Sequence, residues 1–253
     1  MSMHRRLTRT VAIGGLAAMA AAMIAHPGLA VSANQANEPN ANARNRTYEV
    51  TVENLTTGQP FSPGVVVTHS GRFSLFREGD RPSPGIIAIA EDGMPMTATE
   101  DLKAVAGVSD VVTIGSATMP IHRRGGPGPS SITVTIDAGP GATQISLATM
   151  LICTNDGFTG VSSMRLPMQS SASSHEAGVW DAGSEVNDEL FASIVDPCQM
   201  AGPVAAAADG NNNNLPEDGG KIRGHPGIEG NADLTSAHRW TGPVARITVR
   251  RIR

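Results

Sequence analysis

Short segments in which apolar and polar residues alternate dominate the sequence from residue 48 onwards, and most of them end at glycine or proline. In "TYEVTVENLT", the side chains of Tyr48, Val50 and Val52 fall on one face and polar side chains on the other, which is the pattern of a half-buried β-strand. Similar segments are "GVVVTHS", "RFSLF", "SDVVTIG", "SSITVTIDA", "TQISLATMLI" and "GPVARITVRRI". Many short strands separated by turn residues predict an all-β chain, folded as an antiparallel β-sandwich.

Residues 83–107 interrupt this alternation with two helix-like stretches. "SPGIIAIAEDG" has a proline near its start and a glycine after its end, and "TATEDLKAVAG" offers Thr97 or Thr99 as an N-terminal cap ahead of Glu100. Proline, capping residues and glycine in these places are typical of helix boundaries. We therefore expect one or two short helices in a connecting segment.

The first 30 residues have the composition of a secretory signal peptide. Arg5, Arg6 and Arg9 precede the apolar run "VAIGGLAAMAAAMIA", and small residues follow it at the expected cleavage site. A membrane anchor is the alternative, but the run is shorter than the roughly 20 apolar residues that span a bilayer, and it contains Gly14 and Gly15. We expect cleavage, no transmembrane segment in the mature chain, and a secreted, periplasmic or cell-envelope location.

The composition of the remaining chain distinguishes a polar leader, a folded domain and a long loop within that domain. Residues 31–46 are polar and lack an apolar period, as in a disordered leader, so the folded domain is predicted to cover residues 47–253. Residues 201–237 are rich in glycine, asparagine and alanine and are predicted to be a mobile surface loop.

Removing residues 1–30 takes three arginines and no acid from 19 basic and 23 acidic side chains, which leaves a net charge of −7. Nucleic acid is therefore a poor candidate for a partner.

The aromatic and cysteine contents bear on the core and on cross-linking. Aromatic residues make up 3% of the chain, which predicts an aliphatic core and gives little support to sugar binding on stacked aromatic side chains. Cys153 and Cys198 are the only cysteines. In an exported chain this pair is interpreted first as a disulfide, which would stabilise the fold by roughly 4 kcal/mol. Two free buried thiols are the alternative, and a metal site on both cysteines is disfavoured because neither has a further ligand at zinc spacing.

Two acidic clusters follow strand-like segments. Asp156, in "CTNDGFTG", comes shortly after an apolar strand, and Gly157 and Gly160 would let the backbone turn sharply there. In the second stretch, "VWDAGSEVNDE", the carboxylates of Asp181, Glu185 and Asp188 flank a turn. If both loops meet at one end of a sandwich, these like charges need a cation or protons to neutralise them. Carboxylate oxygens on glycine-containing loops suit Ca²⁺.

Other interpretations of these residues stay open. Acidic residues in loops are usually only solvated. A secreted hydrolase that uses Asp156 and Asp181 as a carboxylate pair is a second possibility, although the chain has no G-x-S-x-G, H-E-x-x-H or phosphate-binding glycine loop. A purely structural envelope domain is a third. His225 and His238 are further candidate ligands, but histidines in loops are more often simply exposed.

Four stretches, "YEVTVENLT", "CTNDGFTGVSSMRLP", "VWDAGSEVNDE" and "PVARITVRRI", together resemble the spondin domain of the F-spondin and mindin type, which also occurs in exported bacterial proteins. The resemblance implies a C2-like β-sandwich without enzymatic activity that binds calcium at one end. It also implies a role in cell-surface or extracellular contact with an unidentified protein or surface ligand. The matching positions imply Asp156, Asp181 and Glu185 as calcium ligands, with Asp188 as a further candidate. Glu185 stands where animal members usually have aspartate.

Overall fold

The computed structural model describes residues 45–208 and 210–253. The predicted signal peptide and the predicted leader up to residue 44 lie outside the described residues. Arg46, the last residue of the predicted leader, already belongs to the first strand. No helix in the described part of the chain is both long and apolar enough to cross a membrane.

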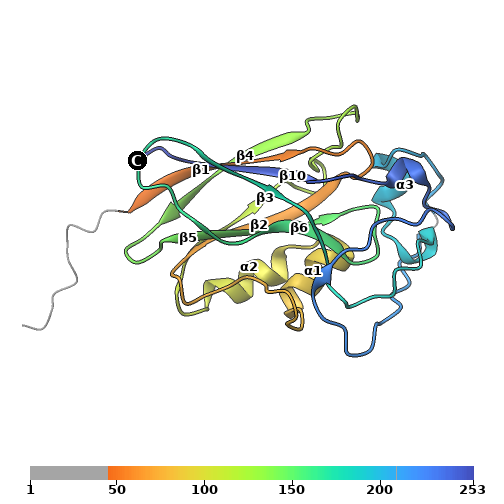
Figure 1. The fold of residues 1–253 in the computed structure, drawn as a ribbon, viewed down its shortest axis with the longest axis horizontal. Coiled ribbons are helices and arrows are strands. Elements are labelled where there is room, and N and C mark those ends of the chain that lie inside the picture. Colours follow the sequence, from red (N-terminus) through yellow and green to blue (C-terminus); the bar gives the residue numbers. More distant parts are fainter. Residues whose placement is uncertain (1–44, 209) are drawn as a thin grey trace, which may run out of the picture. The chain divides into compact units, whose positions relative to one another are not determined.

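Two antiparallel sheets form the body of the domain (Figure 1). The four-stranded sheet has the order β4-β1-β10-β7 and consists of β1 (Arg46–Asn54), β4 (Ser131–Ala138), β7 (Ser173–Ala177) and β10 (Ala245–Arg251). The six-stranded sheet has the order β3-β2-β5-β6-β8-β9 and consists of β2 (Phe61–His69), β3 (Val108–Ile114), β5 (Gln144–Leu151), β6 (Gly157–Arg165), β8 (Val179–Asp181) and β9 (Arg223–Gly224). The predicted all-β sandwich is confirmed.

The main core fills the space between the two sheets. Tyr48, Val50 and Val52 of β1 are fully buried, as their alternation predicts. They pack in one cluster with inward-facing residues of the other sheet, such as Val66 and Leu147. The aliphatic side chains that the composition predicts therefore supply most of this core.

Two helices form a third layer on the outer face of the six-stranded sheet. They are α1 (Pro84–Asp92) and α2 (Met96–Lys103), which lie in the connection between β2 and β3 as predicted (Figure 1). Ile86 and Ile89 of α1 pack against Val65 and Val67 of β2. Shorter elements in the later connections are η1 (Phe191–Ser193), α3 (Pro197–Ala201) and η2 (Ser236–His238).

The segment "RFSLF", residues 72–76, is not a strand, so this prediction is wrong. Leu75 and Phe76 are neighbours in sequence and are both buried in the layer between the helices and the sheet. A strand turns neighbouring side chains to opposite faces, so it cannot bury these two together in one layer. An irregular backbone satisfies the packing instead.

Two other local predictions are also wrong, the second of them only in part. Helix α2 begins after Pro95 without a side-chain cap, and Thr99 lies inside it, where its hydroxyl donates to the Pro95 carbonyl at 2.9 Å. Gly160 does not form a sharp turn, because it lies within β6, whereas Gly157, the first residue of β6, completes the turn after β5. At Gly160 a Cβ atom would lie 1.9 Å from the carbonyl oxygen of Leu147, so the glycine allows β6 to approach β5 closely.

The predicted surface loop at residues 201–237 is only partly on the surface. Ile222, Ile228 and Leu234 are buried, and β9, which lies within this segment, pairs with β8. Single apolar residues among glycines and asparagines give no periodic signal, so these anchoring positions are not visible in the sequence. The mobility of the rest of this loop stays a prediction.

Candidate metal centre

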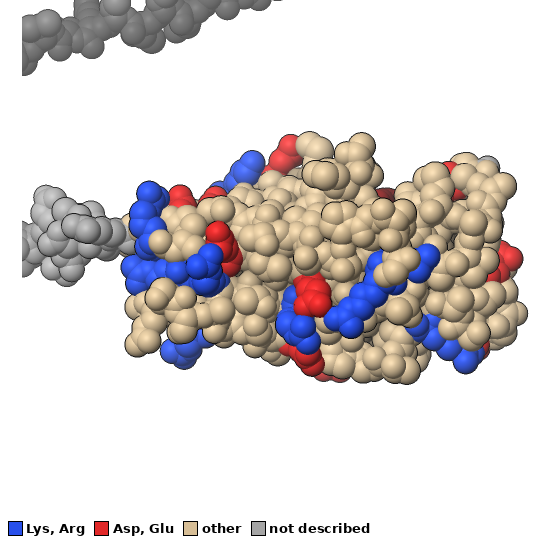
Figure 2. All heavy atoms as spheres, turned by 90° about the horizontal axis from the view of Figure 1, so that it is seen from above, with Lys and Arg blue, Asp and Glu red and all other residues tan. Residues whose placement is uncertain are grey.

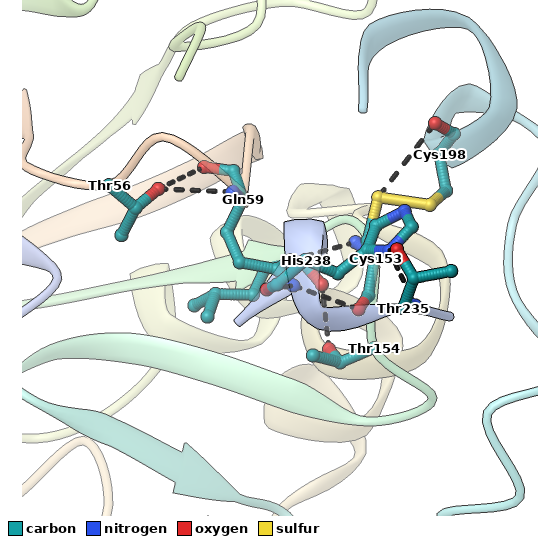
Figure 3. The surroundings of a disulfide bond; sticks show 8 residues. Thr56, Gln59, Cys153, Thr154, Cys198, Thr235 and His238 are labelled. Atoms are coloured by element: carbon teal, nitrogen blue, oxygen red, sulfur yellow. Dashed lines mark hydrogen bonds between the residues drawn. A yellow bond between two sulfur atoms is a disulfide. The ribbon is translucent and has the colours of Figure 1, made fainter. Parts of the chain in front are cut away.

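The chain that leads into the Asp156 loop is fixed by a buried cross-link. Cys153 and Cys198 form a disulfide, which confirms the predicted bond. The Gln59 side chain lies beside it (Figure 3), where its Oε1 accepts from the Cys153 N–H at 3.1 Å. Its Nε2 donates to the carbonyls of Cys153 at 3.1 Å and His238 at 2.8 Å. Because these groups are all buried, the backbone before the acidic loop is held in one position.

The Thr154 hydroxyl then closes the tight turn between β5 and β6. It donates to the carbonyl of Leu151 at 2.6 Å and accepts from the N–H of Gly157 at 3.0 Å. Asp156 therefore stands immediately before β6, and Gly157 is paired directly with Asp181 of β8. Strand pairing thus brings the two predicted acidic stretches to the same end of the six-stranded sheet.

Asp156 and Glu185 meet in the interior of this end of the sheet. Asp156 Oδ2 accepts from the N–H groups of Ser184 at 2.7 Å and Glu185 at 3.0 Å, and from the Ser184 hydroxyl at 3.2 Å. The exposed fractions of Asp156 and Glu185 are only 0% and 2%. Asp156 Oδ1 and Glu185 Oε1 are buried, and neither has a hydrogen-bond partner among the described residues. Each carboxylate therefore has one oxygen that the protein leaves unused.

The electrostatic environment of both groups is unfavourable to charge. Burial, and after it the charge of Asp181, raise the pKa of Asp156 to about 6, although the hydrogen bonds from Ser184 and Glu185 act to lower it. Burial likewise raises the pKa of Glu185 to about 8, with the carboxylates of Glu91 and Asp156 as the next causes. Desolvation and like charge both favour the neutral form of a carboxyl group. Near neutral pH this pair requires a proton or a cation.

Asp181 is fully buried, but both of its oxygens have partners. Oδ1 accepts from the Gly183 N–H at 2.7 Å, and Oδ2 accepts from Asn187 Nδ2 at 2.7 Å and from Arg223 Nη2 at 3.1 Å. Arg223, from β9, also forms an ion pair with Glu217. Asp181 is therefore neutralised from one side by an arginine and contributes mainly by holding its loop in place.

Asp188 shapes the neighbouring turn. Its Oδ1 accepts from Asn155 Nδ2 at 2.9 Å and from the Leu190 N–H at 3.0 Å, and its Oδ2 accepts from the Ser193 hydroxyl at 2.8 Å. The link to Asn155 ties this turn to the residue before Asp156. Asp188 is thus occupied by the protein itself.

One group of three metal-ligating side chains is found within 4.8 Å of one another among residues 45–208 and 210–253: Cys153, Cys198 and His238. Its two sulfurs are bonded to each other, and Nδ1 of His238 accepts from the Thr235 N–H at 2.9 Å. This group is therefore a disulfide packed against a histidine. The other candidate histidine, His225, is half-buried and packs against Trp240 with 5.2 Å between ring centroids.

The three predicted calcium ligands Asp156, Asp181 and Glu185 do not form such a compact group. Within the described residues, the oxygens of Asp156, Asp181 and Glu185 do not all lie within 4.8 Å of one another. The carboxylates that have unused oxygens are Asp156 and Glu185, so these two are the stronger candidates for cation ligands.

The sequence interpretation missed the acidic end of α1. Burial raises the pKa of Glu91, and Asp92 raises it further. Asn214 Nδ2 donates to Glu91 at 2.7 Å, and Asn212 Nδ2 donates to Asp92 at 2.9 Å. Two acids and no basic residue in the last turn of a helix oppose its dipole. That unfavourable placement is the signal that could have identified them.

A family model described as Spondin_N matches residues 40–197, a range that holds Asp156, Asp181 and Glu185. No curated protein matches the sequence. Because the family match spans more than half of the chain, the protein belongs to the Spondin_N family.

Proposed function

We propose that this protein is an exported, non-enzymatic module that binds Ca²⁺ at the Asp156–Glu185 end and makes contacts at the cell surface or outside the cell. The observation that carries the calcium site is the pair of buried carboxylate oxygens without partners, Asp156 Oδ1 and Glu185 Oε1. The family and the disulfide fit an extracellular location. The contact partner is a protein or another surface ligand.

The donor set fits calcium better than a transition metal. Asp156 and Glu185 offer only oxygen atoms, which Ca²⁺ accepts in irregular arrangements, whereas Zn²⁺ prefers nitrogen and sulfur. A cation between them would offset the desolvation and repulsion that raise both pKa values. Asp181 supports this role mainly by holding the loop that leads to Glu185, through its bonds to Gly183 and Asn187.

Burial of the aspartates favours cation binding over hydrolysis. Asp156 and Asp181 are both 0% exposed, and a carboxylate pair that cleaves a glycoside must flank the scissile bond. The hydrolase alternative predicts turnover on glycan or ester substrates that either Asp156→Asn or Asp181→Asn abolishes. A purely structural domain is the remaining alternative and predicts no response to calcium.

Thermal unfolding of the mature chain with Ca²⁺ and with EDTA tests the proposal. Calcium at about 100 times its dissociation constant should stabilise the fold by roughly 2.7 kcal/mol, and EDTA should reverse the effect. Asp156→Asn and Glu185→Gln keep the side-chain shape but remove the charge, so both variants should lose the response. Glu53→Gln, on the exposed face of the four-stranded sheet, is the matched control and should retain it. An unchanged melting temperature of the wild-type chain in Ca²⁺ would overturn the proposal.

A further inference from the structure

A groove of about 690 Å³ runs along the second half of β6, and aromatic side chains line it. Phe73, Phe76 and Trp180 contribute to its walls, although the whole chain has only five Phe, two Trp and one Tyr. The Phe76 ring lies edge-on to Trp180 at 5.8 Å and to Phe158 at 5.0 Å between centroids. The low aromatic content of the chain therefore conceals a local concentration at one surface.

Polar side chains that pair with no other side chain in the described part of the structure surround these rings. Gln144 lines the groove, and its Oε1 is buried without a hydrogen-bond partner. Arg77, Glu78 and His175 line the same groove and are exposed. A site with an aromatic wall and several uncommitted donors and acceptors suits a ligand that has both an apolar face and many hydroxyl groups.

The backbone edge beside the groove is poorly suited to an added peptide strand. Pairing between β8 and β6 covers only Gly157 to Thr159, so the edge of β6 beyond Thr159 has no β8 partner. However, Ser163 has a φ of 68°, and its N–H donates to the Ser146 hydroxyl at 2.8 Å. Such an irregularity interrupts the regular row of backbone groups that strand addition requires.

We propose that this groove binds a saccharide built of pyranose rings. Trp180 and Phe73, which are both partly exposed, contact the apolar face of a sugar ring. Gln144, Arg77 and His175 bind its hydroxyl groups. This inference goes beyond the proposed calcium function, because the groove uses neither Asp156 nor Glu185.

The two tryptophans of the chain provide a direct assay. In a Trp240→Phe variant, Trp180 is the only remaining tryptophan, so its fluorescence reports on the groove alone. Oligosaccharides of glucose, of N-acetylglucosamine and of galacturonic acid serve as probes, and at least one should give a saturable change. Calorimetric titration of the wild-type chain with the same probes gives a second readout that does not depend on the folding of the variant.

Substitutions then separate the groove from other surfaces. Gln144→Ala should weaken binding about tenfold, as expected for the loss of one or two hydrogen bonds, while Gln169→Ala, at an exposed position away from the groove, should leave it unchanged. Glu185→Gln should also bind normally, so a failed calcium site and a failed saccharide site are distinguishable. No saturable response to any of the three sugars in either assay would overturn the proposal. So would a response to a mixture of unstructured peptides but to no sugar, which would assign the groove to peptides.

Discussion

Two acidic regions of this molecule differ in whether the protein neutralises their carboxylates. On the outer face of the four-stranded sheet, Glu53 forms ion pairs with Arg124 at 2.9 Å and Arg246 at 2.8 Å. Arg246 also pairs with Glu176 at 3.0 Å, and Figure 2 shows acidic and basic side chains lying side by side over this face. At the acidic end, by contrast, Asp156 and Glu185 each keep a buried oxygen without a partner.

Strand register explains the difference. Glu49 lies opposite Arg250, and Glu53 lies opposite Arg246, in the pairing of β1 with β10, so the ladder itself supplies a cation to each exposed acid. The acidic end is built from loops, where Arg223 forms ion pairs with Asp181 and Glu217 but with neither Asp156 nor Glu185 among the described residues. Carboxylates are thus neutralised by arginines on the four-stranded sheet, whereas those of Asp156 and Glu185 form no ion pair with any described residue. The second situation is the one that calls for a ligand.

Removal of the disulfide should have the largest effect on stability, and it should affect the acidic end more than the four-stranded sheet. Replacing both Cys153 and Cys198 with alanine should destabilise the fold by roughly 4 kcal/mol, because the cross-link restricts the unfolded chain. Urea unfolding measures the loss. Hydrogen exchange should rise first in the loops that hold Asp156 and Glu185, since the cross-link lies next to them, and should rise less in β1 and β10. An equal rise in both regions would show that the acidic end is not a separately anchored unit.

Asp181 provides the next largest effect. Asp181→Ala should destabilise the fold by about 2 to 3 kcal/mol, because it leaves the Gly183 N–H, Asn187 and Arg223 without their acceptor. A cycle with Arg223→Ala and the double variant measures how much of this loss belongs to the ion pair. A loss below about 0.5 kcal/mol, the size expected at an ordinary surface site, would mean that the buried contacts of Asp181 stabilise the fold no more than the exposed ion pairs of the four-stranded sheet.

The acidic end should also give the domain an unusual pH dependence. The pKa of Glu185 is raised from 4.5 to about 8, so between these values the folded chain holds more protons than the unfolded chain, and stability falls as pH rises. His225, whose burial lowers its pKa from 6.5 to about 4, acts in the opposite direction below pH 6.5. The interval from about pH 6.5 to 8 therefore isolates Glu185.

Melting temperatures measured across that interval in EDTA test this expectation. The wild-type chain should lose stability with rising pH, and Glu185→Gln should show a flatter profile. Saturating Ca²⁺ should remove most of the wild-type decline, because the cation replaces the proton. A wild-type profile in EDTA that is flat or rises with pH would contradict the buried, unmet charge at Glu185.

The sequence predicts the sheets better than it predicts what covers them. Alternation at Tyr48, Val50 and Val52 succeeds because β1 has one buried and one solvated face. The same alternation fails at residues 72–76, because Leu75 and Phe76 are both buried in the layer beneath the helices. Alternation in the sequence indicates which face of a single strand is buried. It gives no reliable signal where a third layer of structure buries neighbouring side chains together.

The candidate site is predictable in its residue types and less so in its geometry. Strand pairing brings the stretches that hold Asp156, Asp181 and Glu185 to one end of the sheet, but this arrangement depends on the pairing of β6 with a strand of only three residues, Val179–Asp181. The arginine that pairs with Asp181 belongs to β9, which lies in a segment whose sequence shows no periodic pattern. The aromatic groove is hidden in the same way, because its residues are dispersed in sequence and only the fold gathers them.

Substitution of Glu53 should have the smallest effect on stability, and it measures what an exposed carboxylate of the four-stranded sheet contributes. Its side chain is 32% exposed, and its two arginine partners are more exposed still, so water can replace each ion pair when it is broken. Glu53→Gln should therefore cost at most about 1 kcal/mol, and the cost should shrink in high salt because screening weakens exposed pairs. Melting temperatures of this variant in low and high salt provide the measurement. If its loss equals that of Asp181→Ala and does not respond to salt, burial is not what distinguishes the two regions, and the inference that the acidic end needs a cation loses its physical basis.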